Sequence, residues 1–356
     1  MNYRITGTGS CIPDIAKKNS DFLKNKFLDT DGGKFQTSNS EIIDKFNSIT
    51  GIYERRYAPD EINCSDLAAV AADLAINDSK LDQETLDYII VAHNTGDISC
   101  SSGQVDTLPS VASKVKAKLK IKNPNCVAYD IICGCPGWVE GIIQAKSFIK
   151  SGMAEKCLVI GCDTLSRILD ENDRDSMIYA DGSGAIVLES DSSYDGGILS
   201  HKSATFTYDG ENDFIFYGTS YNRRKRTKSD QKFIKMQGRK VYEFALKNVP
   251  VAMKSCFDEA DCKIEDLKKI FIHQANQKMD EAIINRFFRL YNLSTPKDIL
   301  PMNIEEFGNS SVATIPTLFD LVKKTNYKGH ILSEGDIIMF ASVGAGMNIN
   351  AITYKV

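Results

Sequence analysis

This 356-residue chain lacks the features that mark membrane, secreted or nucleic-acid-binding proteins. It has no run of about 18 apolar residues, so we expect no membrane-spanning helix. Its first residues lack the apolar core of a signal peptide, which predicts a cytoplasmic protein. Neither charge is in large excess, and a net charge of −4 gives no general attraction to nucleic acid.

Histidines are few, and the ten cysteines do not have the spacing of a metal site. The close pairs Cys133/Cys135 and Cys157/Cys162 are not CxxC pairs and have no matching histidine pair, so we predict no zinc site. Without a secretion signal, reduced thiols are the default, and most of these cysteines should be small buried residues. We expect no metal and no other cofactor.

Apolar, β-rich segments alternate with amphipathic segments in the first half of the chain. Residues 87–93 and 157–162 are typical of buried strands, and residues 108–119 and 137–152 of helices between them. Strand, helix and strand at this spacing predict a mainly parallel sheet with crossover helices. The predicted fold class is therefore α/β.

The second half repeats this order of elements. It has a predicted strand, two helices and a further strand: 269–272, 277–291, 311–324 and 336–341. The similar order suggests an internal duplication. We therefore divide the chain into two halves, residues 1–190 and residues 191–356.

Cys135 lies between a predicted strand, residues 127–132, and a predicted helix. Pro136 and Gly137 suit a helix start, because proline lacks an N–H that would be unpaired there. A cysteine at this position meets the positive end of the helix dipole, which favours the thiolate, and a sharp bend leaves backbone N–H groups beside the sulfur. The alternative is a buried structural cysteine. Cys133 is the competing thiol, and we place it in a pocket wall.

His273 and Asn309 are the candidate partners of this thiol. His273 follows an apolar strand, and ligands of α/β sheets bind outside the carboxyl ends of strands. His93 also ends a strand, so position alone does not separate the two histidines. Asn309 lies just before a helix, where an ordinary N-cap is the alternative. Thiol, imidazole and carboxamide together suit thioester chemistry, in which a thiolate takes an acyl group and oriented donors stabilise an oxyanion or enolate.

A glycine-rich segment at residues 343–347 follows the last predicted strand and lies about ten residues from the C-terminus. Its glycines let the backbone approach a ligand closely. A dinucleotide-binding loop is the alternative, but no helix of useful length follows it.

Several segments, in one order, carry a family resemblance. They are Ile49-Thr-Gly-Ile-Tyr-Glu-Arg-Arg56, the bend at Cys135, Tyr179-Ala-Asp-Gly-Ser-Gly-Ala185, His273-Gln-Ala-Asn276, Gly308-Asn309 and the terminal glycine loop. Together they resemble the β-ketoacyl-acyl-carrier-protein synthase III family of the thiolase superfamily. The resemblance runs over nearly the whole chain.

This resemblance implies a five-layer αβαβα thiolase-like fold of two similar halves, in a homodimer. It implies that Cys135 takes an acyl group from a primer thioester. His273 and Asn309 would hold the carbonyl of a malonyl- or β-ketoacyl-type extender while it loses carbon dioxide, and the backbone N–H groups of Cys135 and Ala345 would form an oxyanion hole. The implied reaction is a decarboxylative Claisen condensation, in fatty acid or specialised lipid or polyketide biosynthesis of the dialkylresorcinol kind.

The resemblance also implies substrate-binding residues. Phe46 stands near the place of a family tryptophan that stacks on the adenine of coenzyme A, and Arg174 near that of an arginine packing on the same ring. The missing tryptophan favours a primer carried on the phosphopantetheine of acyl carrier protein rather than of coenzyme A. We place Leu108, Cys133 and Trp138 at the acyl pocket. Leu108 replaces an aromatic residue that reaches across the dimer, so we expect primers longer than acetyl.

A basic cluster offers a docking surface for acyl carrier protein. Arg223 and Arg224 begin the densest basic run, and Arg239 continues it. Lys278 takes the place of a basic family residue and would add to the surface. The alternative is a solvated hairpin.

Two other functions remain open alternatives. One is acyl transfer to an alcohol or amine without decarboxylation. The other is a non-catalytic partner subunit of a ketosynthase heterodimer, although such a subunit has no reason to retain all three of the catalytic residue types.

Overall fold

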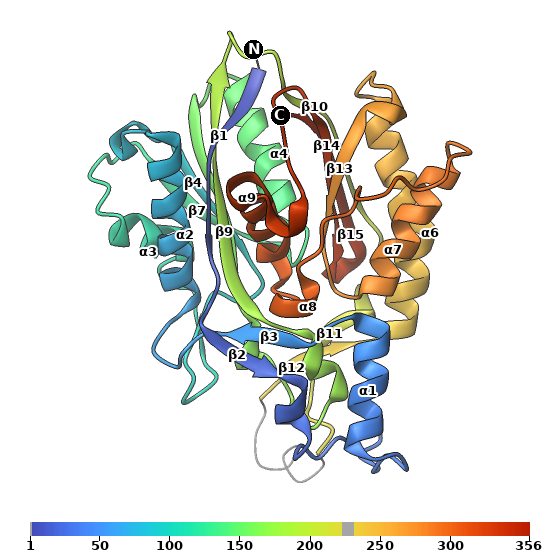
Figure 1. The fold of residues 1–356 in the computed structure, drawn as a ribbon. Coiled ribbons are helices and arrows are strands. Elements are labelled where there is room, and N and C mark those ends of the chain that lie inside the picture. Colours follow the sequence, from blue (N-terminus) through green and yellow to red (C-terminus); the bar gives the residue numbers. More distant parts are fainter. Residues whose placement is uncertain (1, 223–230) are drawn as a thin grey trace.

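The computed structural model describes residues 2–222 and 231–356, which form five layers of helices and sheets (Figure 1). Two β-sheets face each other across a pair of central helices, and further helices cover the outer face of each sheet. This αβαβα arrangement confirms the predicted thiolase-like α/β fold.

The first sheet has five strands in the order β1-β9-β8-β4-β7. Their bounds are β1 (Asn2–Cys11), β4 (Tyr88–His93), β7 (Val127–Ile132), β8 (Lys156–Thr164) and β9 (Asp181–Asp191). Strand β4 pairs in parallel with β7 and β8, whereas β9 pairs antiparallel with β8 and β1. Both strands predicted in the first half therefore lie side by side in this sheet.

The second sheet has four strands in the order β10-β15-β14-β13. Their bounds are β10 (Gly197–Thr205), β13 (Leu267–Ile272), β14 (Ile337–Gly344) and β15 (Asn348–Lys355). Strands β13 and β14 are parallel, and β15 is antiparallel to β14 and β10. The pattern repeats that of β1-β9-β8-β4, so β4 corresponds to β13 and β8 to β14.

The helices fill the three remaining layers. The central pair is α4 (Gly137–Lys150) and α9 (Thr314–Thr325); the outer helices are α2 (Cys64–Ser79) and α3 (Val111–Lys118) on the first sheet, and α6 (Gly238–Asp258) and α7 (Gln277–Arg289) on the second. Helix α3 begins later than predicted because the side chain of Ser110 caps it by accepting a hydrogen bond from the Ser113 N–H. No helix in the described ranges is both long and apolar enough to cross a membrane.

Three apolar clusters hold these layers together. The central cluster lies between the two sheets and contains Trp138, Ile142, Phe271 and Phe340. The second joins α2 and α3 to the first sheet, and the third joins α6 and α7 to the second sheet. Each helix layer is thus held by burial of its own apolar face.

Shorter elements lie around these layers, several of them at one end of the sheets. They are α1 (Asn39–Thr50), α8 (Ile304–Phe307), β2 (Ile15–Lys18), β3 (Glu54–Tyr57), β5 (Asp97–Ile98), β6 (Val105–Asp106), β11 (Ile215–Gly218) and β12 (Phe233–Met236). Helix α1 and the β11–β12 hairpin stand at the lower end in Figure 1, beside the ends of α6 and α7.

Candidate active site

A cavity of about 490 Å³ lies among α1, α6, α7 and the β11–β12 hairpin, a size typical of ligand sites. Its wall brings together Cys135, His273 and Asn309, with Ser311 and Ala345 beside them. Much of the remaining wall is apolar: Ile42, Phe46, Ile49, Ile215, Ile234, Met236, Val241 and Met279. The three predicted catalytic side chains therefore share one enclosed space.

Cys135 lies in the sharp turn between β7 and α4. Pro136 is the N-cap of α4, and Gly134 turns the chain with a φ of +55°. Gly344, at the end of β14, packs directly on this turn. A Cβ at Gly344 would come within 2.9 Å of the Cys135 Cβ and 3.1 Å of the Cys135 backbone nitrogen, so a larger residue does not fit.

The Cys135 thiol is protonated at rest. Burial raises its pKa to about 12, although the Ser311 hydroxyl donates a hydrogen bond to the sulfur at 3.3 Å. Desolvation is the largest effect on this thiol, and it opposes the predicted effect of the helix end.

A short chain of hydrogen bonds lies behind the sulfur. Asn94 donates from its backbone N–H to Asp163 Oδ1 at 2.8 Å and from Nδ2 to Asp163 Oδ2 at 2.6 Å. The same Nδ2 donates to the Ser311 hydroxyl at 2.8 Å. Burial raises the pKa of Asp163 to about 6, against the effect of these hydrogen bonds.

His273 follows β13 directly and is buried. Its backbone N–H donates to the Ala341 carbonyl at 2.8 Å, which extends the pairing of β13 with β14 by one residue. Burial lowers the pKa of its imidazole to about 4, and a contact with the Ser311 backbone offsets this only in part. Within the described ranges, Nδ1 of the ring has no hydrogen-bond partner. The ring is therefore a neutral imidazole near pH 7.

Hydrogen bonds hold both the backbone and the side chain of Asn309. Its backbone exchanges hydrogen bonds with the neighbouring strand-like segment, donating to the Ile178 carbonyl at 3.0 Å and accepting from the Ala180 N–H at 2.8 Å. Its side-chain oxygen accepts from the Ser311 N–H at 2.8 Å. This resembles the N-cap alternative, but Asn309 also lines the cavity. With its oxygen engaged, the amide nitrogen is the group that can donate to a ligand.

The backbone segments of the predicted oxyanion hole are in contact. The Ala345 nitrogen lies 3.7 Å from the position of a Cβ at Gly134, the residue before Cys135. Ala345 follows Gly344, which packs on the Cys135 turn. The N–H groups of Cys135 and Ala345 are thus carried on adjoining turns beside the sulfur.

Phe46 and Arg174, the predicted substrate-binding residues, both line the cavity. Phe46 is on α1, and Arg174 begins a short 3-10 helix, Arg174–Ile178. The Arg174 guanidinium lies 5.0 Å from the centre of the Phe35 ring, a cation–π distance. Arg174 is exposed, so this side chain stands toward the outer end of the cavity.

Two residues predicted at the acyl pocket do not line the cavity. Trp138 is fully buried between the sheets, where its ring meets that of Phe340 edge to face at 5.5 Å. It cannot reach the cavity because α4 turns it into the layer that faces the second sheet. Cys133 is half-buried and packs near Gly137. Trp138 and Cys133 thus lie outside the cavity wall of the single chain, and their place at the acyl pocket stays a prediction.

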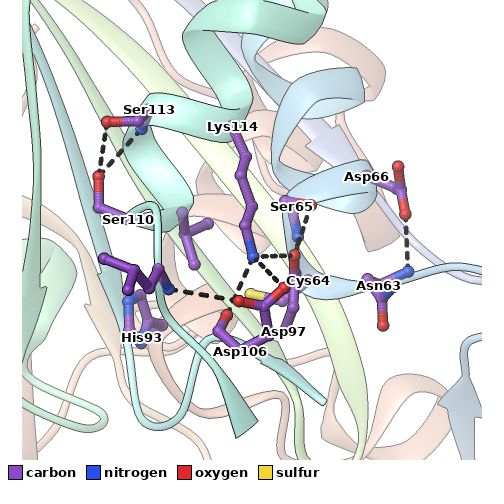
Figure 2. A network of polar contacts seen from close by, with 12 residues as sticks. Asn63, Cys64, Ser65, Asp66, His93, Asp97, Asp106, Ser110, Ser113 and Lys114 are labelled. Carbon is purple, nitrogen blue, oxygen red and sulfur yellow. Dashed lines mark hydrogen bonds and ion pairs between the residues drawn. The ribbon is translucent and has the colours of Figure 1, made fainter. Parts of the chain in front are cut away.

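Leu108 is also absent from the cavity wall, and its side chain is 90% exposed. The polar network in Figure 2 holds the segment that carries it. Lys114 forms ion pairs with Asp97 at 3.0 Å and Asp106 at 2.9 Å, and Asp97 accepts hydrogen bonds from Ser65 N and Oγ. Leu108 is therefore presented outward by an anchored loop, away from the pocket of its own chain.

Two of the predicted carrier-docking residues lie in the described ranges, at the starts of α6 and α7. Arg239 is exposed at the start of α6 and forms an ion pair with Glu243 at 2.8 Å. Lys278 is exposed on the first turn of α7. Arg223 and Arg224 lie outside the described residues. Helices α6 and α7 both flank the cavity, so Arg239 and Lys278 stand on elements that enclose it.

Asn94, Asp163 and Ser311 are residues of the site that sequence reasoning missed. Each follows or ends an apolar strand or lies beside Asn309, which was the available signal. Among the described residues, no group of three or more histidine, cysteine, aspartate or glutamate side chains is placed to hold a metal ion.

Comparison with known proteins assigns a family to this site. The family model for 3-oxoacyl-[acyl-carrier-protein] synthase III matches residues 129–206, and the model for the C-terminal part of that enzyme matches residues 257–356. The first match contains Cys135, and the second contains His273 and Asn309. The chain belongs to the 3-oxoacyl-[acyl-carrier-protein] synthase III family.

Individual relatives align with this chain over almost their full length. The β-ketoacyl-[acyl-carrier-protein] synthase III of Ehrlichia ruminantium (strain Welgevonden) is 32% identical over 349 residues, covering 97% of this chain and 96% of the relative. The enzyme of that name from Prochlorococcus marinus (strain MIT 9215) is 30% identical, covering 98% and 95%. The crystal structure of the Aquifex aeolicus VF5 synthase III matches with a TM-score of 0.80 at 28% identity, covering 99% of this chain and all of that one.

These relatives are named as condensing enzymes of the acyltransferase type. Synthase III membership makes this chain a ketosynthase of the same reaction class, with a condensing role in fatty acid or polyketide biosynthesis.

Proposed function

We propose that this ketosynthase joins an acyl primer, held on Cys135, to a malonyl- or β-ketoacyl-type extender by decarboxylative Claisen condensation. The observation that carries the proposal is the shared cavity, in which a thiol, a neutral imidazole and an oriented carboxamide meet.

The first half-reaction acylates Cys135. The sulfur attacks the primer thioester carbonyl, and the oxyanion is stabilised by the backbone N–H groups of Cys135 and Ala345. The new C–S bond forms as the bond to the carrier sulfur breaks. The thiol proton leaves Cys135 through the neutral ring of His273 and ends on the departing carrier thiolate.

The second half-reaction uses His273 and Asn309 as donors. Both hold the extender thioester oxygen while its terminal C–C bond breaks and carbon dioxide leaves. The electron pair becomes an enolate, whose carbon attacks the acyl-cysteine and expels the Cys135 thiolate. Because burial keeps His273 neutral, it stabilises the enolate without an acidic proton that would quench the carbanion.

We propose that both substrates arrive as thioesters on the phosphopantetheine of acyl carrier protein. Phe46 offers less ring surface at the cavity than the tryptophan of the family, which weakens selection of coenzyme A. Arg239 and Lys278, on helices that enclose the cavity, would contribute to docking of an acidic carrier, together with Arg223 and Arg224.

We propose a homodimer, in which Leu108 reaches the acyl pocket of the partner. Strand β7 is an edge strand in the described chain, and it exposes Val127 by 46% and Ile132 by 73%. Unpaired strand edges with apolar side chains favour pairing with another chain.

All ten cysteines are free, which suits the reducing cytoplasm.

Carbon dioxide release tests the condensation. We expect equimolar carbon dioxide and β-ketoacyl product from malonyl carrier protein and an acyl primer. Product formed by acyl transfer without carbon dioxide would replace the proposal by simple transfer, and no adduct and no product would favour a non-catalytic subunit.

Primer length is tested with a graded series of acyl chains. We expect acyl groups longer than acetyl to react faster, because each buried methylene contributes about 0.8 kcal/mol against an apolar wall. A strict preference for acetyl would contradict this part of the proposal.

A further inference from the structure

Three polar side chains behind Cys135 have no part in the proposed reaction. They come from three separate places in the fold: Asn94 directly after β4, Asp163 near the end of β8, and Ser311 at the start of the 3-10 helix before α9. They meet because β4 and β8 are parallel neighbours and the segment before α9 packs against β8.

Their hydrogen bonds orient the Ser311 hydroxyl. The Asn94 carboxamide nitrogen has two hydrogens, and its partners are Asp163 Oδ2 at 2.6 Å and Ser311 Oγ at 2.8 Å. Ser311 therefore accepts from Asn94, and its own hydroxyl can donate to the Cys135 sulfur at 3.3 Å, with the Asp163 carboxylate as the competing acceptor. The carboxylate of Asp163 holds the carboxamide in this orientation through two hydrogen bonds.

The arrangement is buried and conformationally specific. Asp163 is 1% exposed and Ser311 is 2% exposed. Ser311 adopts a φ of +55°, which residues other than glycine rarely adopt, and such strained residues cluster at functional sites. In this conformation its backbone N–H reaches Asn309 while its hydroxyl reaches Cys135. Ser311 thus contacts both Asn309 and Cys135.

We propose that the Ser311 hydroxyl is a further catalytic group, which stabilises the Cys135 thiolate when it forms and when it is expelled, and that Asn94 and Asp163 position it. This deepens the proposed function, since it assumes that Cys135 is the acyl acceptor. Burial disfavours the thiolate, so a donor already aimed at the sulfur provides the stabilisation that water cannot.

The test is the alkylation rate of Cys135 by iodoacetamide, followed by peptide mass spectrometry because nine other cysteines are present. We expect Ser311→Ala to slow alkylation about 10-fold at pH 8, equivalent to a rise of about one unit in the thiol pKa. Ser310→Ala is the matched control. Its hydroxyl contacts Thr314 Oγ1 at 3.5 Å, and this variant should react at the wild-type rate.

Ser311→Gly separates the hydroxyl from the backbone strain, because glycine adopts a positive φ freely. We expect it to be as slow as Ser311→Ala. A wild-type rate in either variant overturns the proposal, and recovery in the glycine variant alone would assign the effect to the backbone.

Asn94→Ala tests the positioning role. It should slow alkylation, and the Asn94→Ala/Ser311→Ala double variant should be no slower than Ser311→Ala alone, because both act through one proton. Additive effects would contradict this coupling.

A second readout separates this proposal from the proposed function. Alkylation needs no thioester, so it reports on Ser311 even if condensation fails. In a Cys135→Ala background the thiolate is absent, so the control Ser310→Ala should leave malonyl-thioester decarboxylation unchanged, and Ser311→Ala is compared with it. A loss there would assign Ser311 a structural role at Asn309 instead.

Discussion

His93 and His273 occupy equivalent positions in the two halves of the molecule, yet only one lines the cavity. Ala92 pairs with Gly161 of β8, and Ile272 pairs with Ala341 of β14. His93 directly follows Ala92, and His273 directly follows Ile272. The two strands, β4 and β13, correspond by topology. The difference between them comes from what covers each strand end.

The end of β4 that carries His93 is covered by β7 and by the start of α3. The ring of His93 is completely buried, and its Nε2 lies 3.0 Å from Asp130 Oδ2. Asp130, on β7, also accepts hydrogen bonds from the N–H groups of Val111 and Ala112, which begin α3. These hydrogen bonds lower the pKa of Asp130 despite burial. This histidine therefore joins a strand to a helix and has no route to a ligand.

The His273 end opens to the cavity and has no carboxylate on its ring. Within the described residues, the second sheet has no strand equivalent to β7, so no residue there corresponds to Asp130. A histidine at a strand end can therefore reach a ligand where no neighbouring strand, such as β7, covers that end. A partner carboxylate would favour the imidazolium, whereas His273 is kept neutral by burial.

Replacement of His273 should give the largest effect. We expect His273→Ala to lower condensation by about 10³-fold, because it removes a donor to the enolate and a proton acceptor. Steady-state turnover with malonyl carrier protein checks this. His93→Gln is the matched variant at the equivalent position, and it should retain turnover within about 10-fold; equal losses in both would remove the distinction.

The Asp130 contacts should appear in stability rather than in chemistry. Asp130→Ala leaves His93 and two helix N–H groups without a partner, so we expect the free energy of unfolding to fall by about 3 kcal/mol. Denaturant unfolding measures this. Asp191→Ala, at an exposed surface pair with Arg4, is the control and should change it by less than about 1 kcal/mol.

Burial of His273 should also make the stability of the protein depend on pH. The pKa of His273 is about 4 in the folded chain and 6.5 when unfolded, so the folded state binds this proton less tightly. Its contribution is complete above pH 6.5 and is lost as the pH falls toward 4, by about 3 kcal/mol. Relative to His273→Asn, the wild type should lose that amount over this range. If the free energies of unfolding of the wild type and of His273→Asn changed with pH in the same way, the His273 ring would not be desolvated.

Sequence patterns were sufficient for the fold and for the three principal residues of the site. Cys135 and His273 follow apolar strand segments, Asn309 follows Gly308 ahead of a helix, and strand ends of a parallel sheet share one edge. The polar chain behind Cys135 was missed because Asn94, Asp163 and Ser311 are far apart in the sequence and meet only when β4 pairs with β8.

The residues predicted at the acyl pocket lie outside the cavity wall of the single chain. Helix periodicity identifies the apolar face of α4, but it does not say which layer that face meets, and Trp138 packs between the sheets. The predicted role of Leu108 assumes a second chain, which no pattern within one chain can position. His93 and His273 were equivalent by position in the sequence, and the structure separates them by the Asp130 contact of His93 and by the place of His273 in the cavity wall.

Peptide-resolved mass spectrometry after incubation with an acyl thioester tests the central claim most directly. The account predicts one acyl group, on Cys135, in the wild type and in His93→Gln, and none in Cys135→Ala. An acyl group on another cysteine, or an unmodified Cys135 in protein that remains folded, would contradict it.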